Sequence, residues 1–157
     1  MQEMFGPMAD IGAVVDRLKS LMDEEGLPFD AGRDMTFNSR LAQELAKWGE
    51  SKPQSDALNM ALYQAYFVAG LNIGDLDVLL GIVEAVGLPV EEARVVLEER
   101  RMKTAVDEDW RHALSIGVRS VPTFAVGLKG VAGAQPYEQL AQMLEQLGAE
   151  KRRDGME

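Results

Sequence analysis

Apolar residues recur at helical spacing up to about Ile116, and this pattern ends at Gly117. The run from Val121 to Val126 is then β-rich, and a shorter piece, Val131-Ala132, follows a glycine-containing turn. A period near 3.6 residues is typical of amphipathic helices, whereas a short β-branched run bounded by glycines is typical of a strand. We therefore expect a mostly helical α+β fold with about seven helices and one hairpin, the last helix starting at Pro136.

Each expected helix has an apolar stripe. In chain order the stripes are Met8, Ile11, Val15, Leu18 and Met22; Leu41, Leu45 and Trp48; Leu58, Ala61, Leu62, Ala65 and Tyr66; Leu76, Leu79, Leu80 and Val83; Val90, Ala93 and Leu97; Val106, Trp110 and Ala113; and Tyr137, Leu140, Met143, Leu144 and Leu147. Asn38 and Asp75 are placed to act as N-caps, and glycines such as Gly87 are placed to end helices. Both tryptophans are expected to be mostly buried.

The 157 residues contain no cysteine and one histidine. This composition removes disulfides, thiolate ligands and thiol nucleophiles, and it excludes a multi-histidine site, so we expect no metal and no cofactor. The formal net charge of −10 argues against nucleic-acid or anionic-membrane partners. No apolar run approaches the roughly 18 residues that span a bilayer, and no signal-peptide pattern is present. We therefore expect a cytoplasmic protein.

The string Gly117-Val118-Arg119-Ser120-Val121-Pro122-Thr123-Phe124 resembles the cis-proline loop of the thioredoxin superfamily. Further segments, "FNSRLAQELAKW", "ALYQAYFVAGLNIGDLDVLLGIVEAVGLPVEEA" and "GVAGAQP", resemble the DsbA-like family of the FrnE type. The resemblance covers about Phe5 to Leu147. It implies a cis Val121–Pro122 bond and a substrate-binding loop formed by Ser120, Val121 and Pro122, where backbone groups pair with an extended peptide.

In that family a βαβ unit with Cys-x-x-Cys precedes the helical insertion, and these 157 residues contain no match to it. The expected organisation is therefore a single domain over 1–157. About 5–116 would form the helical insertion, about 117–147 the cis-proline loop, hairpin and last helix of a thioredoxin-like half, and 148–157 a flexible tail. No catalytic residue is nominated, and we expect the chain to be inactive alone as a thiol–disulfide oxidoreductase.

Several residues allow a second interpretation. His112 has no nucleophile nominated beside it, so a structural role is preferred to that of a catalytic base. Asn38 is first a helix cap. The layout also resembles kappa-class glutathione transferases, which have a substrate-binding asparagine near this point. The acidic run Asp107 to Asp109 is expected to be a solvated helix face. Nine methionines could line an adaptable groove, but several fall on core positions.

Three functions stay open. The chain can be a truncated DsbA-like protein, or a non-catalytic module that binds a peptide, glutathione or the missing βαβ unit of another chain. The third is an enzyme related to 2-hydroxychromene-2-carboxylate isomerase or kappa-class glutathione transferase. A lone hairpin is marginal in water and its edge presents unpaired backbone groups. A homodimer is therefore also expected, in which the second chain covers either this edge or the helix faces that would have packed on the missing strands.

Overall fold

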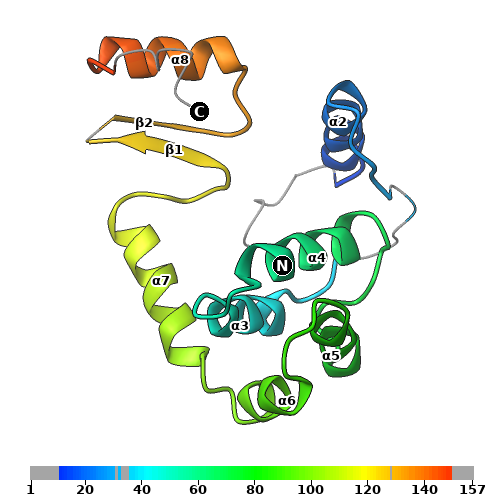
Figure 1. The fold of residues 1–157 in the computed structure, drawn as a ribbon. Coiled ribbons are helices and arrows are strands. Elements are labelled where there is room, and N and C mark those ends of the chain that lie inside the picture. Colours follow the sequence, from blue (N-terminus) through cyan, green and yellow to red (C-terminus); the bar gives the residue numbers. More distant parts are fainter. Residues whose placement is uncertain (1–10, 31, 33–35, 128, 150–157) are drawn as a thin grey trace, which may run out of the picture. The chain divides into compact units, whose positions relative to one another are not determined.

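The structure is a computed structural model that describes residues 11–30, 32, 36–127 and 129–149. Its elements are α2 (Ile11–Glu24), α3 (Arg40–Gly49), α4 (Ser55–Phe67), α5 (Leu76–Ala85), α6 (Val90–Glu98), α7 (Lys103–Ser115), β1 (Thr123–Val126), β2 (Lys129–Ala132) and α8 (Tyr137–Gln146) (Figure 1). Within these residues, seven helices and one two-stranded sheet confirm the predicted mostly helical class. The expected Met8, and the tail beyond residue 149, lie outside the described residues.

Helix ends follow the local rules that the sequence indicates. The Asp75 carboxylate accepts the N–H groups of Asp77 and Val78 at 2.9 and 3.2 Å, which confirms the predicted N-cap of α5. Gly87, after α5, and Gly117, after α7, have φ angles of +74° and +84°. A Cβ is sterically unfavourable in this left-handed region, so glycine ends these helices without that strain.

The described residues fall into two compact units, one that ends at Asp107 and one that begins at Glu108. In the first unit, helices α3, α4, α5 and α6 pack pairwise around one core (Figure 1). Its most buried large apolar side chains are Leu45, Leu58, Leu79, Val83 and Leu97, all predicted from the apolar stripes. Trp48 is 5% exposed, as predicted.

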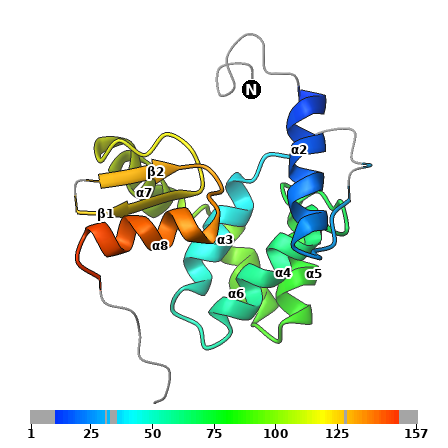
Figure 2. The ribbon, with the colours of Figure 1, turned by 90° about the horizontal axis from the view of Figure 1, so that it is seen from above.

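The second unit contains the later turns of α7, the hairpin and α8. Strands β1 and β2 pair antiparallel, from Thr123 opposite Ala132 to Val126 opposite Lys129. Helix α8 runs beside the hairpin in both views (Figures 1 and 2). The second strand thus begins at Lys129, inside the segment that the sequence predicts as a turn.

Three predicted core positions of the second unit are wrong. Trp110 is 51% exposed, Tyr137 is 78% exposed, and Leu144 is also exposed. Periodicity shows which residues share a face of a helix, but it does not show whether another element covers that face. Val106, one turn earlier on α7 than Trp110, belongs to the first unit and is buried there.

Candidate functional site

The candidate site predicted from sequence is the loop that joins α7 to β1. Ser120, Val121 and Pro122 are all exposed, and Val121 is 88% exposed. The peptide bond between Val121 and Pro122 is cis, the isomer that the family resemblance implies. The Thr123 hydroxyl donates to the Ser120 carbonyl at 2.7 Å, which ties the first residue of β1 back to the loop.

The hydrogen bonds of the hairpin reveal which backbone groups of β1 face outward. The Gly133 N–H donates to the Pro122 carbonyl at 2.8 Å. Pro122 and Gly133 thus form a hydrogen-bonded pair, and the next pair along the hairpin is Thr123 with Ala132. Bonded and non-bonded pairs alternate along an antiparallel ladder. Because the pair before it is bonded, the Thr123–Ala132 pair is a non-bonded one.

The alternation continues along β1. Phe124 and Val126 belong to bonded pairs, so their N–H and C=O groups face β2. Thr123 and Ala125 belong to non-bonded pairs, so their N–H and C=O groups face the opposite edge. The described sheet has only these two strands, and no strand of the described residues pairs with that edge. Two donors and two acceptors are therefore aligned along it.

The second unit also exposes much of its apolar surface. None of its described side chains between residues 108 and 149 is buried, whereas the first unit has a buried core. Phe124 and Val126 share one face of β1 and are 36% and 37% exposed. Apolar surface that gathers around an unpaired strand edge is typical of an interaction site.

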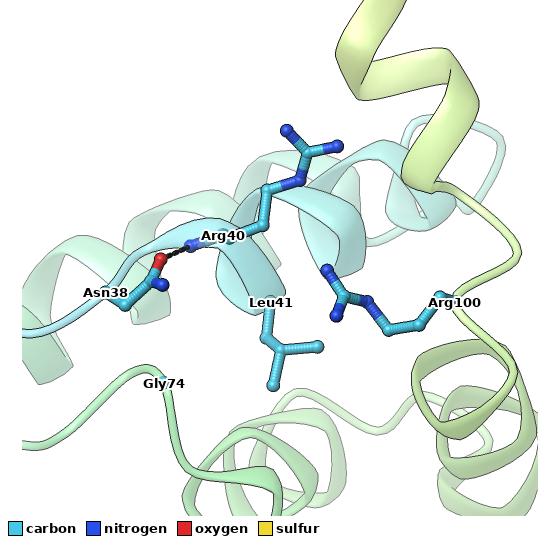
Figure 3. Close-up of a pocket in the computed structure, with 5 residues that line it drawn as sticks. All are labelled: Asn38, Arg40, Leu41, Gly74 and Arg100. Atoms are coloured by element: carbon cyan, nitrogen blue, oxygen red, sulfur yellow. Dashed lines mark hydrogen bonds between the residues drawn. The ribbon is translucent and has the colours of Figure 1, made fainter.

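A separate pocket of about 180 Å³ lies in the first unit. It is lined by Asn38, Arg40, Leu41, Gly74 and Arg100 (Figure 3). The Asn38 side-chain oxygen accepts the Arg40 N–H at 2.9 Å, so Asn38 does cap the start of α3 in part, although Ser39 occupies the N-cap position itself. The side-chain oxygen that Asn38 would need to bind a substrate is thus already engaged by the Arg40 N–H.

Both arginines of the pocket bind Glu44, which is fully buried. Arg100 donates to its two carboxylate oxygens at 2.8 and 2.7 Å, and Arg40 donates to one of them at 2.9 Å. The hydrogen bonds from Arg100 lower the pKa of Glu44, although burial acts in the opposite direction. Glu44 in turn raises the pKa of both guanidinium groups. Glu44 therefore stays ionised.

Arg40 also donates to the Asp107 carboxylate at 2.6 Å. This corrects the expectation that the run from Asp107 to Asp109 is only a solvated face. Two guanidinium groups face two carboxylates, so the cluster has no excess charge with which to attract an ion. We interpret this pocket as part of the structural link between α3 and the start of α7.

His112, weighed from the sequence as a catalytic base, is exposed on α7. The sequence did not single out Thr123 and Ala125, because their contribution is made by the backbone. The signal was available in the hairpin pattern: once the register is known, alternate residues of an edge strand must face outward. Within the described residues, no helix is long and apolar enough to span a bilayer.

Comparison with known proteins places these features in a family context. A family model described as DSBA-like thioredoxin domain matches residues 5–145. YwbO, an uncharacterized protein of Bacillus subtilis, is 33% identical over 84 residues, which are 51% of this chain and 42% of YwbO. The chain therefore spans less than half the length of this curated relative.

A solved structure is also similar. The crystal structure of a probable DsbA oxidoreductase from Streptomyces coelicolor matches with a TM-score of 0.76 and 27% sequence identity. The match covers 96% of this chain and 67% of that one. It therefore includes most of both units.

Proposed function

The chain belongs to the family of DSBA-like thioredoxin domains, and from this premise we propose that it is a member that binds an extended polypeptide without catalysing thiol–disulfide exchange by itself. Exchange needs a thiolate as the attacking group. The 157 residues include no cysteine, so a thiol would have to come from another polypeptide segment.

One observation carries the binding proposal. The N–H and C=O groups of Thr123 and Ala125 face an edge that has no partner strand within the described residues. An extended segment can add to such an edge as a further strand, and its main chain then supplies the hydrogen bonds. The exposed Phe124 and Val126 offer apolar contacts to the side chains of that segment. The loop residues Ser120, Val121 and Pro122 lie directly before this edge and belong to the proposed site.

The experiment changes the backbone of this edge and leaves the hairpin intact. Ala125→Pro removes an outward N–H group, and its ring stands where an added strand would lie. Proline is tolerated at edge positions whose N–H faces solvent. Ala132→Pro is the matched control, because Ala132 belongs to the non-bonded pair with Thr123 and its N–H faces the opposite edge of β2.

Binding is measured by fluorescence anisotropy with a short labelled peptide of alternating valine and threonine. We expect Ala125→Pro to weaken binding about tenfold or more, because one or two backbone hydrogen bonds at about 1 kcal/mol each and their flanking contacts are lost. Ala132→Pro should bind as the unchanged chain does. Equal affinity of all three proteins, or weakening by Ala132→Pro alone, would refute the proposed edge.

Other occupants of the edge follow from the sequence resemblance. A second copy of the chain would give a twofold dimer, and light scattering across a concentration series tests it. A βαβ unit that carries Cys-x-x-Cys would bind as a separate polypeptide and is tested by co-purification. Glutathione is tested as a competitor of the labelled peptide.

The isomerase and transferase alternatives rest on the resemblance alone. Cytoplasmic location is part of the proposal, and cell fractionation tests it.

A further inference from the structure

We propose that the polypeptide bound at the outer edge of β1 is acidic. This inference rests on the proposed function and names the chemical class of its ligand. The evidence is the distribution of charge around the hairpin. Between Gly117 and Pro136 the only charged residues are Arg119 and Lys129, in a chain whose formal net charge is −10. An added strand would therefore have two cations and no carboxylate of the loop and hairpin beside it, although α8 carries Glu138 and Glu145.

Both cationic side chains are exposed. Within the described part of the chain, neither Arg119 nor Lys129 is within ion-pair distance of a carboxylate. Most other arginines and lysines of the two units, such as Arg100 and Lys52, do pair with a carboxylate. The two cations beside the hairpin therefore keep their charge available for a partner.

Their places in the chain put these charges near an added strand. Lys129 is opposite Val126 in the register, so its side chain shares a face with Val126 and Phe124. A strand added to β1 would lie about 10 Å from β2, two strand spacings away, and a lysine side chain covers much of that distance. Arg119 precedes the exposed Val121 by two residues, at the end of the edge where β1 begins.

The charges also discriminate against a second copy of the chain. If two β1 strands paired edge to edge about a twofold axis, each would bring its own Arg119 and Lys129 to the same short sheet. The two Lys129 residues would lie three strand spacings apart, about 14 Å, which is within the screening length of about 30 Å at 0.01 M salt, so their like charges repel weakly. A heterologous acidic segment has no such penalty, so we favour it over self-association at this edge.

The test compares three labelled peptides that differ only in their polar residues: valine alternating with glutamate, with lysine or with threonine. Exposed ion pairs contribute little individually, and two pairs that change from attractive to repulsive correspond to about a tenfold difference in affinity. We expect the glutamate peptide to bind about tenfold more tightly than the lysine peptide at low ionic strength. The preference should shrink as salt rises, because the screening length falls from about 30 Å at 0.01 M to about 8 Å at 0.15 M.

Two variants separate the local charge from the global charge. The double substitution Arg119→Glu and Lys129→Glu should remove or invert the preference for the glutamate peptide. The double substitution Arg17→Glu and Lys19→Glu makes the same change in net charge at two exposed side chains of α2. It should leave the preference intact.

The outcomes distinguish this inference from the proposed function. If the glutamate and lysine peptides bind equally, or the lysine peptide binds more tightly, the acidic ligand class is wrong, while weakening by Ala125→Pro would still support the edge. If both charge-reversed proteins lose the preference alike, net charge governs and the local inference is also wrong. If no peptide binds, the proposed function fails together with the inference.

Discussion

Replacing Glu44 by glutamine removes the charge at the centre of the arginine cluster in the first unit. The glutamine side chain has nearly the same volume as that of glutamate, so packing around the site is preserved. In the unchanged protein the Glu44 carboxylate accepts three hydrogen bonds, two from Arg100 and one from Arg40. An amide can accept through only one oxygen, and its NH₂ group would point at a guanidinium. The substitution therefore tests the charge and the hydrogen bonds rather than the volume.

The expected cost follows from the burial of Glu44, which is 0% exposed. Hydrogen bonds to charged groups contribute about 1.5–3 kcal/mol each, and breaking a buried ion pair costs about 3–5 kcal/mol. Both arginines keep some access to water, so part of their charge can be solvated after the substitution. We therefore expect Glu44→Gln to lower the free energy of unfolding by about 2–4 kcal/mol.

The dependence on pH has a defined sign. The folded pKa of Glu44 is lowered from its ordinary value of 4.5, chiefly by the hydrogen bonds from Arg100. Its contribution to stability is therefore fully present above about pH 5 and is lost as the pH falls below 4.5 through the folded pKa. In Glu44→Gln this part of the acid destabilisation should be missing, so the difference in stability between the two proteins should shrink as the pH falls below 4.5.

Urea unfolding followed by tryptophan fluorescence measures these differences, because the buried Trp48 lies in the same unit. Glu84→Gln on the exposed face of α5 is the matched control, and it should change stability by less than about 0.5 kcal/mol. If Glu44→Gln costs no more than this control, or if its deficit stays constant as the solution is acidified, the cluster is not the electrostatic anchor described here.

The remaining predictions concern caps, packing, exposure and chemistry. Asp75→Ala should cost about 1 kcal/mol in thermal unfolding, because the N-cap of α5 is lost; an unchanged melting temperature would contradict the cap. Gly49→Ala should cost about 1–2 kcal/mol in urea unfolding, because its Cβ would lie 2.5 Å from Leu58 Cδ2 in the core, and a stabilised variant would contradict that close packing. Acrylamide should quench Trp110 more strongly than Trp48 when each is studied as the single tryptophan, and equal quenching would contradict their different burial. The purified chain should not accelerate insulin reduction by dithiothreitol, and acceleration would contradict a thiol-free binding role.

The first unit could be predicted in some detail because its signals are local. Glycines such as Gly87, the Asp75 cap and the stripe of Leu79 and Val83 each depend on residues within a turn or two. These signals gave the order of the helices and most of the core. The exposure of Trp110 could not be predicted in this way, because it depends on which element lies against its face of α7.

The arginine cluster lay beyond sequence reasoning for a different reason. Arg100 and Glu44 are separated by 56 residues, and Arg40 and Asp107 by 67. Arg100 also adopts a φ angle of +54°, which is uncommon for a residue with a side chain. Nothing in the local sequence indicates that this backbone conformation would direct the guanidinium toward a buried carboxylate.

The loop of Ser120, Val121 and Pro122 was located from sequence, but the binding groups that we propose lie one step further along the chain. They are backbone atoms of Thr123 and Ala125, and their direction depends on the register of the hairpin. A sequence pattern predicts that a strand exists more securely than it predicts which of its peptide groups face outward.

Amide hydrogen exchange at β1, measured by NMR with and without a saturating glutamate–valine peptide, tests the central claim most directly. In the free chain the amides of Phe124 and Val126 should be protected by β2, whereas those of Thr123 and Ala125 should exchange quickly. Peptide binding should slow exchange at Thr123 and Ala125 and leave the other two nearly unchanged. If the peptide binds and these two amides still exchange as quickly as before, the chain does not bind polypeptide by strand addition at this edge.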